Sequence, residues 1–221
     1  MIFIELFVPK GALDPGQKRR VAERLGSIEE LGAGTEGEST MAAGPAAVFG
    51  ALFHVVVHEP DVWVVGERAL GPEDRPRFLV RVHVPGPWRK DMSEILISDA
   101  TRIIAEECCV VAEERGVGAP SYSDPAHSDL DVQVHVVGVS EGSIGLGGAV
   151  TTSQGIVDLM NRPLVDAAAR GEALEDPVCG MLVPLGPDAV TLEWDGELLA
   201  FCCRGCRDGF VEKRHRAAAR G

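Results

Sequence analysis

The chain has 221 residues, of which 45% are hydrophobic and 25% charged, a composition that allows a sizeable apolar core. Its formal net charge is −13. The part from Ala173 onward has eight acidic and six basic residues, so it carries −2 and the rest carries −11. An acidic body disfavours nonspecific binding to nucleic acid or to anionic membranes, so we expect neither partner.

The N-terminal segment, residues 1–9, is apolar but lacks a basic start and a small-residue cleavage site. It predicts a first strand and not a signal peptide. The longest apolar runs, such as residues 62–65, have the length of strands and are too short to span a bilayer. These features predict a cytoplasmic protein.

The first half of the chain begins with a strand, a helix and a returning strand. Asp14 is a good N-cap and Pro15 suits the first helical position, so a helix should start there. A loop rich in Gly, Ala and Thr follows that helix. In chain order, we expect a strand ending at Pro9, a helix over 14–31, a strand over 51–58 and a short strand over 62–65.

The same order occurs a second time. We expect a strand over 78–84, a helix over 91–115, a strand over 131–139 and a short segment over 144–148. Pro9 and Pro85, which end the two opening strands, are 76 residues apart. This period is longer than that of ordinary solenoid repeats and indicates a duplicated unit.

Two strand–helix–strand units predict an α+β domain with a four-stranded sheet and two helices on one face. The other face of the sheet would then be uncovered. Residues 53–57 are apolar on both sides of their strand, which favours burial of that face as well. We therefore expect a homo-oligomer.

Residues 1–150 resemble the tautomerase superfamily, the group of 4-oxalocrotonate tautomerase and macrophage migration inhibitory factor. The resemblance implies a duplicated βαβ domain and, for members with two fused units, a trimer. It also implies catalysis by an N-terminal proline whose free amine is the base. Here the second residue is an isoleucine, Ile2, and not a proline. Pro9 cannot replace it, because its nitrogen is an amide and is not basic. We interpret this domain as a tautomerase-like scaffold without the usual catalysis.

Histidines recur in the expected strands. His54 and His58 share a face of one strand, and His83 and His135 lie in two others. Gathered on one sheet face, they would form a polar pocket or a metal site. We favour the plainer interpretation, in which each is hydrogen-bonded near a subunit interface. A tautomerase using His54, His58 or His135 as its base stays open as an alternative.

Residues 151–174 have the features of a linker. A helix is possible over 156–170, interrupted near Pro163. Gly171 marks the best domain boundary before the C-terminal segment.

Four of the six cysteines lie in the last 43 residues: Cys179, Cys202, Cys203 and Cys206. Disulfides are disfavoured in the cytosol, so clustered cysteines indicate metal or redox chemistry. The Asp195-Gly196 pair between apolar runs predicts a hairpin that brings Cys179 near Cys202. Cys202 and Cys206 share a face at helical spacing, so three thiolates converge on a site for Zn²⁺ or Cu⁺.

Residues 175–216 resemble the YHS domain of the TRASH group, small treble-clef or zinc-ribbon-like metal-binding modules. The run from Asp176 to Met181 matches the opening of that motif, and Phe201-Cys202, Cys206 and Phe210 match its second half. The resemblance implies one ion per chain, bound by Cys179, Cys202 and Cys206. Three residues differ from the family's Tyr, His and Ser: Leu199, Ala200 and Cys203.

The fourth ligand is open at this point. Cys203 stands where the family has a hydroxyl, and His215, Asp176 and water are further candidates. The sequence therefore favours a metal-binding protein with a catalytically impaired tautomerase-like scaffold. The alternative is an isomerase of the tautomerase type with a structural zinc module.

Overall fold

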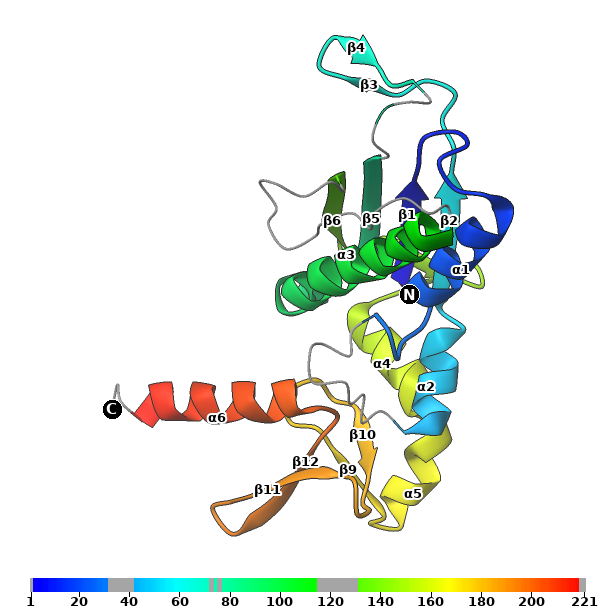
Figure 1. Cartoon of the computed structure of the whole chain (residues 1–221). Coiled ribbons are helices and arrows are strands. Elements are labelled where there is room, and N and C mark those ends of the chain that lie inside the picture. The colour runs from blue at the N-terminus through cyan, green and yellow to red at the C-terminus, as the bar shows by residue number, and fades with distance from the viewer. Residues whose placement is uncertain (1, 32–41, 72–73, 75–76, 115–130, 219–221) are drawn as a thin grey trace. The chain divides into compact units, whose positions relative to one another are not determined.

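The computed structural model describes residues 2–31, 42–71, 74, 77–114 and 131–218 (Figure 1). The chain divides into two compact units. Unit 1 comprises Met1–Gly37 and Phe53–Ser140, and unit 2 comprises Glu38–Leu52 and Glu141–Gly221. Among the described residues, no helix combines the length and the apolar character needed to cross a membrane.

Unit 1 is built on one four-stranded sheet in the order β2-β1-β5-β6. β1 pairs in parallel with β2, β5 pairs in parallel with β6, and β1 and β5 join the two pairs antiparallel. This is the α+β arrangement of two βαβ units that the sequence predicts. The strands are β1 (Ile2–Phe7), β2 (Phe53–His58), β5 (Arg77–Pro85) and β6 (Asp131–Val139).

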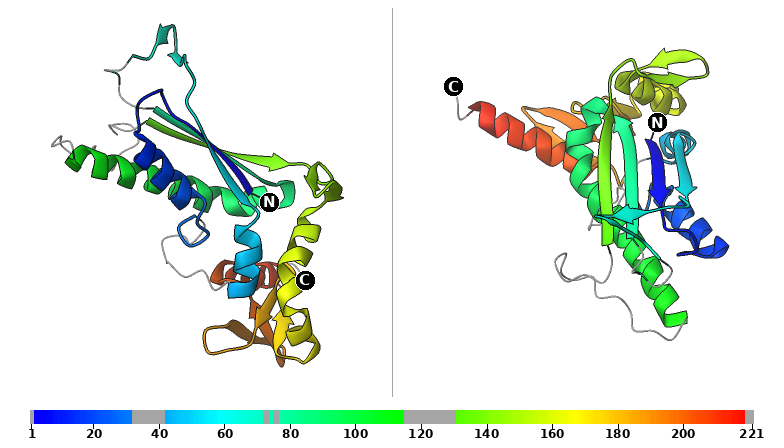
Figure 2. Two further views of the ribbon diagram at one scale, coloured as in Figure 1. Left: turned by 90° about the vertical axis from the view of Figure 1, so that its right-hand side faces the viewer. Right: turned by 90° about the horizontal axis from the view of Figure 1, so that it is seen from above.

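Two helices, α1 (Pro15–Leu25) and α3 (Arg89–Glu114), cover one face of this sheet (Figure 2). A short 3₁₀ helix, η1 (Gly86–Trp88), leads into α3. The covered face holds the core because alternate residues of the central strands point to it. Its fully buried strand residues are Ile2, Ile4, Leu6, Val80, Val82 and Val84. No helix in the described part of unit 1 covers the other face, as predicted.

Helix α1 starts where its sequence signals predict and ends earlier than predicted. Asp14 and Gln17 form a capping box, each side chain bonding the other's backbone N–H. The helix ends at Leu25, not near Leu31, because Gly26 takes the C-cap position. The predicted end of α3 at Arg115 lies outside the described residues.

Two small hairpins stand where the sequence predicts a single short strand or segment. The expected strand over 62–65 is the hairpin of β3 (Val64–Val65) and β4 (Arg68–Ala69) in unit 1. The expected segment over 144–148 is the hairpin of β7 (Ile144–Leu146) and β8 (Ala149–Thr151) in unit 2.

Helix α2 (Ala43–Gly50) falls in a stretch that the sequence analysis assigns to a loop. It is alanine-rich, which favours a helix, and its Phe49 is buried. Helix α2 belongs to unit 2 and lies beside helix α4 (Ser153–Asn161). At Gly44 a Cβ would lie 2.9 Å from Pro163 Cβ, so the close approach needs glycine. Tertiary packing thus stabilises a helix whose amphipathic pattern is weak.

The rest of unit 2 surrounds the cysteines. The possible helix over 156–170 is divided into α4 (Ser153–Asn161), η2 (Arg162–Leu164) and α5 (Val165–Ala169). Two hairpins and a terminal helix follow: β9 (Ala173–Glu175) with β10 (Leu182–Pro184), β11 (Val190–Trp194) with β12 (Glu197–Phe201), and α6 (Arg204–Ala218).

The predicted hairpin at Asp195-Gly196 is confirmed. Both residues have positive φ, 52° and 84°, as a two-residue type I′ turn requires. Behind the hairpin, Phe210 of α6 meets Trp194 edge-on at 5.8 Å and Phe201 at 5.6 Å between ring centroids. These rings attach α6 to the hairpin, and α6 carries Cys206.

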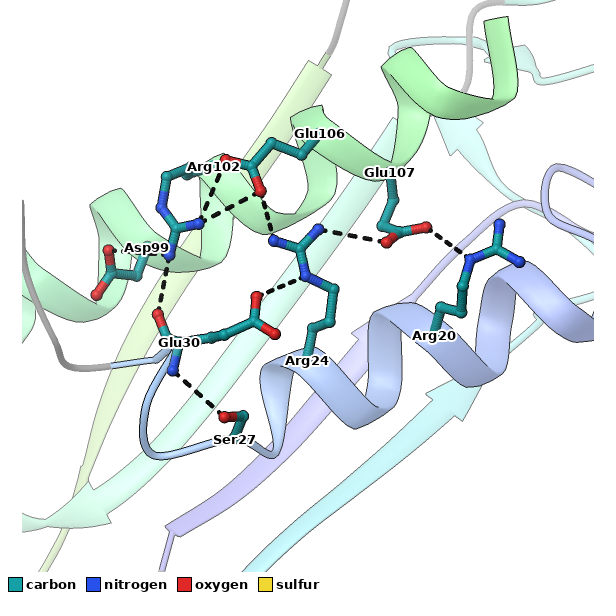
Figure 3. Close-up of polar contacts among 8 residues, drawn as sticks. All are labelled: Arg20, Arg24, Ser27, Glu30, Asp99, Arg102, Glu106 and Glu107. Atoms are coloured by element: carbon teal, nitrogen blue, oxygen red, sulfur yellow. Dashed lines mark hydrogen bonds and ion pairs between the residues drawn. The ribbon is translucent and has the colours of Figure 1, made fainter. Parts of the chain in front are cut away.

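An ion-pair network joins α1 to α3 (Figure 3). Arg24 of α1 contacts Glu106 and Glu107 of α3 and also Glu30. Arg20 adds a second contact to Glu107 at 3.1 Å. The Glu107 side chain is only 9% exposed, so these two arginines compensate a buried negative charge.

We expect Arg24→Ala to lower the free energy of unfolding by about 2 kcal/mol, because it removes one of the two cations that compensate a buried charge. Urea unfolding followed by both far-UV circular dichroism and tryptophan fluorescence measures this. The control is Arg19→Ala on the same helix, which breaks only the exposed pair with Glu23 and should cost at most about 0.5 kcal/mol. Equal costs for the two variants would contradict the role of the network.

The same variant has an expected pH dependence. Burial raises the pKa of Glu106, but hydrogen bonds from Arg24 and Arg102 outweigh burial and lower it overall. Since the folded-state pKa lies below the unfolded one, the stabilisation is complete above the unfolded pKa and is lost as the pH falls through the folded pKa. The difference between wild type and Arg24→Ala should therefore shrink in acid.

Candidate metal centre

Three thiols meet at one end of unit 2. Cys179 lies in the loop between β9 and β10, Cys202 follows β12, and Cys206 lies in the first turn of α6. Cys202 Sγ is 3.4 Å from Cys179 Sγ and 3.6 Å from Cys206 Sγ. With a carboxylate oxygen of Asp176, these sulfurs form a group whose atoms all lie within 4.8 Å of one another. The structure thus brings together three of the four cysteines that the sequence indicates.

Asp176 connects the two halves of this cluster. Its side chain is fully buried, with 0% exposure. One carboxylate oxygen accepts the N–H of Val178 and the other accepts the N–H of Cys202, both at 2.8 Å. Burial raises the pKa of this carboxyl, and these backbone hydrogen bonds oppose the rise. The carboxylate therefore fixes the Cys179 loop against the end of β12.

The Cys179 loop is also held from α4. Asn161 Nδ2 donates to the carbonyl of Gly180 at 2.8 Å, and the N–H of Leu182 donates to Asn161 Oδ1 at 2.7 Å. Gly180 has φ +77°, which favours glycine at the turn. The sequence analysis misses Asn161, because it lies 18 positions before Cys179 with no local motif linking the two.

Cys203 contacts the thiols of Cys202 and Cys206 and also caps α6. It immediately precedes α6, and its Sγ accepts the N–H of Cys206 at 3.4 Å. This is the hydrogen bond that an N-cap side chain makes to the third helical residue. The hydroxyl of the resembled family would suit the same role, so Cys203 acts here as an N-cap. It does not belong to the group of four donors found among the described residues.

Shared protons set the acidity of the cluster. Hydrogen bonds from Cys202 and then Cys206 lower the pKa of Cys179 to about 3, against the effect of burial. The same contacts raise the pKa of Cys202, and the bond to Cys179 raises that of Cys206. Hydrogen bonds from Cys202 and Cys206 lower the pKa of Cys203 to about 2. Cys179 and Cys203 thus give up their protons easily, whereas Cys202 and Cys206 keep theirs.

The donor set fits a thiophilic ion. Sulfurs bound tetrahedrally to zinc at about 2.3 Å are about 3.8 Å apart, which is a few tenths of an ångström more than the two separations here. Thiolates suit Zn²⁺ and Cu⁺, and ion binding would replace the shared protons. Cys179, Cys202 and Cys206 are the residues that would hold the ion.

A second polar group lies on the uncovered face of the sheet in unit 1. Glu5 of β1 lies between two histidines: its oxygens are 2.9 Å from His83 Nε2 and 3.4 Å from His58 Nε2. Phe7 stacks on His58 with ring centroids 4.5 Å apart. The sequence analysis misses Glu5, although its alternation with the buried Ile4 and Leu6 places it on this face.

The strand register places all four strand histidines on this face. His54 of β2 and His83 of β5 both pair with Phe3 of β1, one from each side. His135 of β6 pairs with Arg81 of β5. His54 and His135 are exposed, whereas His58 and His83 are partly buried around Glu5. The predicted shared face of His54 and His58 is confirmed, and the register adds His83 and His135 to it.

Comparison with known proteins gives structural likenesses at low identity. No family model matches the sequence, and no curated protein matches it. The structure is similar to N1, a member of the cis-3-chloroacrylic acid dehalogenase family, with a TM-score of 0.45 and 13% identity over 76% of this chain and 96% of that one. A native fused 4-OT has a TM-score of 0.39 and 17% identity, over 67% of this chain and 94% of that one. MIF2 of Leishmania major has a TM-score of 0.38 and 17% identity, over 68% of this chain and 97% of that one.

We expect Asp176→Ala to destabilise unit 2 by about 2 kcal/mol in the presence of a chelator, because two buried backbone N–H groups lose their acceptor. Hydrogen exchange measured by mass spectrometry should show faster exchange at Val178 and Cys202. Asp188→Ala, at an exposed position of the same unit, is the control and should change little. Unchanged exchange at these two amides in Asp176→Ala would contradict the assigned role.

Proposed function

We propose that this chain is a metal-binding protein that coordinates one thiophilic ion, Zn²⁺ or Cu⁺, through Cys179, Cys202 and Cys206. The observation that carries the proposal is the convergence of three sulfurs from separate segments within 4.8 Å of one another and of a buried carboxylate. The buried carboxylate supports the proposal because it accepts the N–H groups of Val178 and Cys202 and so holds two of the sulfur-bearing segments together.

The resemblance to the YHS module supports the same function. In residues 175–216, Asp176 opens the matching hexapeptide, and its hydrogen bonds to Val178 and Cys202 give that position a physical reason. Phe201 and Phe210, the aromatic residues of the second half, pack on each other beside the thiols. We propose a treble-clef or zinc-ribbon-like module on this basis.

The compartment and assembly are part of the proposal. The described cysteines Cys108, Cys179, Cys202, Cys203 and Cys206 are reduced, which fits the cytoplasm. Unit 1 is a tautomerase-like scaffold whose uncovered face exposes Val56 and Val137 at 39% and 37%. We propose that this face joins copies into a homo-oligomer, a trimer by resemblance, and light scattering that gives the mass of a single chain would contradict this.

We expect the purified protein to carry one equivalent of zinc or copper per chain. The variant with Cys179, Cys202 and Cys206 all replaced by serine should carry none, because hydroxyls are poor ligands for these ions. Elemental analysis of both proteins, expressed with each metal in turn, measures this. Cys108→Ser is the matched control, because it removes a thiol of α3 in unit 1. Equal, substoichiometric metal in all three proteins would rule out the proposal.

A second candidate is an isomerase of the tautomerase type that uses a base other than proline. The observation in its favour is the Glu5 group. Glu5 holds the Nε2 atom of His83 at 2.9 Å, an arrangement that orients an imidazole as an acid–base group. Arg81 lies over the Phe7 ring at 5.1 Å and provides a cation on the same face.

This candidate predicts enol–keto turnover of phenylpyruvate or 2-hydroxymuconate. Glu5→Gln should lower kcat by about tenfold to a hundredfold, because the histidine loses its anionic partner. Gln133→Ala, at an exposed position of β6 outside the Glu5 group, should leave the rate unchanged. A wild-type rate equal to that of buffer, with the protein folded, would exclude this function.

A further inference from the structure

The uncovered face of the sheet in unit 1 combines apolar side chains with balanced charge (Figure 2). Alternation along the paired strands places apolar residues on it, including Phe3, Phe7, Val56, Leu79 and Val137. The same alternation gives it two arginines and two carboxylates, namely Arg77, Arg81, Glu5 and Asp131. These strand residues therefore carry no net charge while the histidines of the face are neutral, although the whole chain carries −13.

This balance makes a second copy of the chain a suitable partner for the face. Two acidic chains repel each other in general, but two neutral patches can meet without that cost. The Phe7 ring is stacked on His58 at 4.5 Å between centroids, and the Arg81 guanidinium lies 5.1 Å from the same ring. Aromatic and arginine side chains are enriched at protein interfaces, so this arrangement suits a contact between copies.

The two acids of the face are already engaged. Asp131 forms an ion pair with Arg77. Glu5 lies 2.9 Å from His83 Nε2 and 3.4 Å from His58 Nε2, so one carboxylate serves two imidazoles. If both imidazoles were charged, Glu5 would offset only one of the two charges.

The other two histidines of the face are not in contact with these acids. His135 pairs across the strands with Arg81, which is a cation, and like charges directly opposite each other are destabilising. His54 is exposed on the edge strand β2. The acids that follow β2 are held by lysines, Glu59 by Lys18 and Asp61 by Lys10. A proton on His54 or His135 would therefore add charge that this face does not offset.

We propose that the uncovered face is a pH-sensitive interface between copies of this chain, which associate while its histidines are neutral and separate when they are protonated. Imidazole is the side chain that changes charge between about pH 8 and about pH 5. Charge buried between two copies loses its water and meets the same charge on the neighbour, which is costly. This inference rests on the proposed assembly through this face and adds its regulation.

The chain as a whole predicts the opposite pH trend, which makes the effect recognisable. Its isoelectric point is about 4.9, so mild acidification reduces its net negative charge. A smaller net charge weakens the repulsion between copies and favours association. Dissociation of a folded chain in mild acid would therefore indicate a local charge, as the four histidines provide.

The test is sedimentation velocity of the full chain at about pH 8 and about pH 5.5, at one protein concentration and one ionic strength. The wild type should be an oligomer at the higher pH, and its dissociation constant should rise by at least about tenfold at the lower pH. An oligomer of equal strength at both values would overturn the inference and leave the assembly in place. A single chain at both values would overturn the inference and the assembly together. Neither outcome bears on metal binding by unit 2.

Matched variants assign the effect to the face. His54→Gln combined with His135→Gln removes two titrating groups at exposed positions and should abolish most of the dissociation in acid. His215→Gln, on α6 in unit 2, should dissociate as the wild type does. Wild-type dissociation in the double variant would overturn the inference. Loss of the far-UV circular dichroism signal along with dissociation would also overturn it, because the effect would then lie in folding.

Discussion

The buried carboxylate of Asp176 is the interaction on which the geometry of unit 2 depends. It accepts one N–H from the Cys179 loop and one from the end of β12, which are distant in sequence. Burying a charge is expensive, so the carboxylate is retained only where it fixes something that apolar packing cannot. Here it fixes the separation of two thiols at 3.4 Å. An acid that has no access to solvent thus positions the two segments that carry these thiols.

The forces that hold the two units are different. Unit 1 relies on a layer of fully buried aliphatic residues between the sheet and its two helices, reinforced by the arginine–glutamate network. Unit 2 has a smaller apolar core, in which Phe201 and Phe210 carry much of the packing. A bound ion would therefore contribute a larger share of the stability of unit 2 than any single contact contributes to unit 1.

Sequence reasoning succeeds here where the signal is local. Asp14 and Pro15 determine the start of α1, and Asp195 with Gly196 determines the hairpin turn, because each acts within a few residues of the backbone it shapes. It fails where the determinant is tertiary. Helix α2 is stabilised by α4, and neither Asn161 nor Glu5 has a motif that indicates its partners. For the candidate site, spacing indicates the thiols, whereas the contacts of Asp176 with both thiol-bearing segments need the structure.

The start of β1 has a packing role in this chain. Ile2 is fully buried in the sheet core and is paired with Phe53 of β2. A smaller side chain there would remove aliphatic volume from the core, so packing fixes this end of β1. Polar chemistry in unit 1 lies instead in the middle of β1, at Glu5, on the opposite face of the same strand. The two faces of β1 therefore differ in kind, because one carries core aliphatic residues and the other carries a carboxylate held by His83.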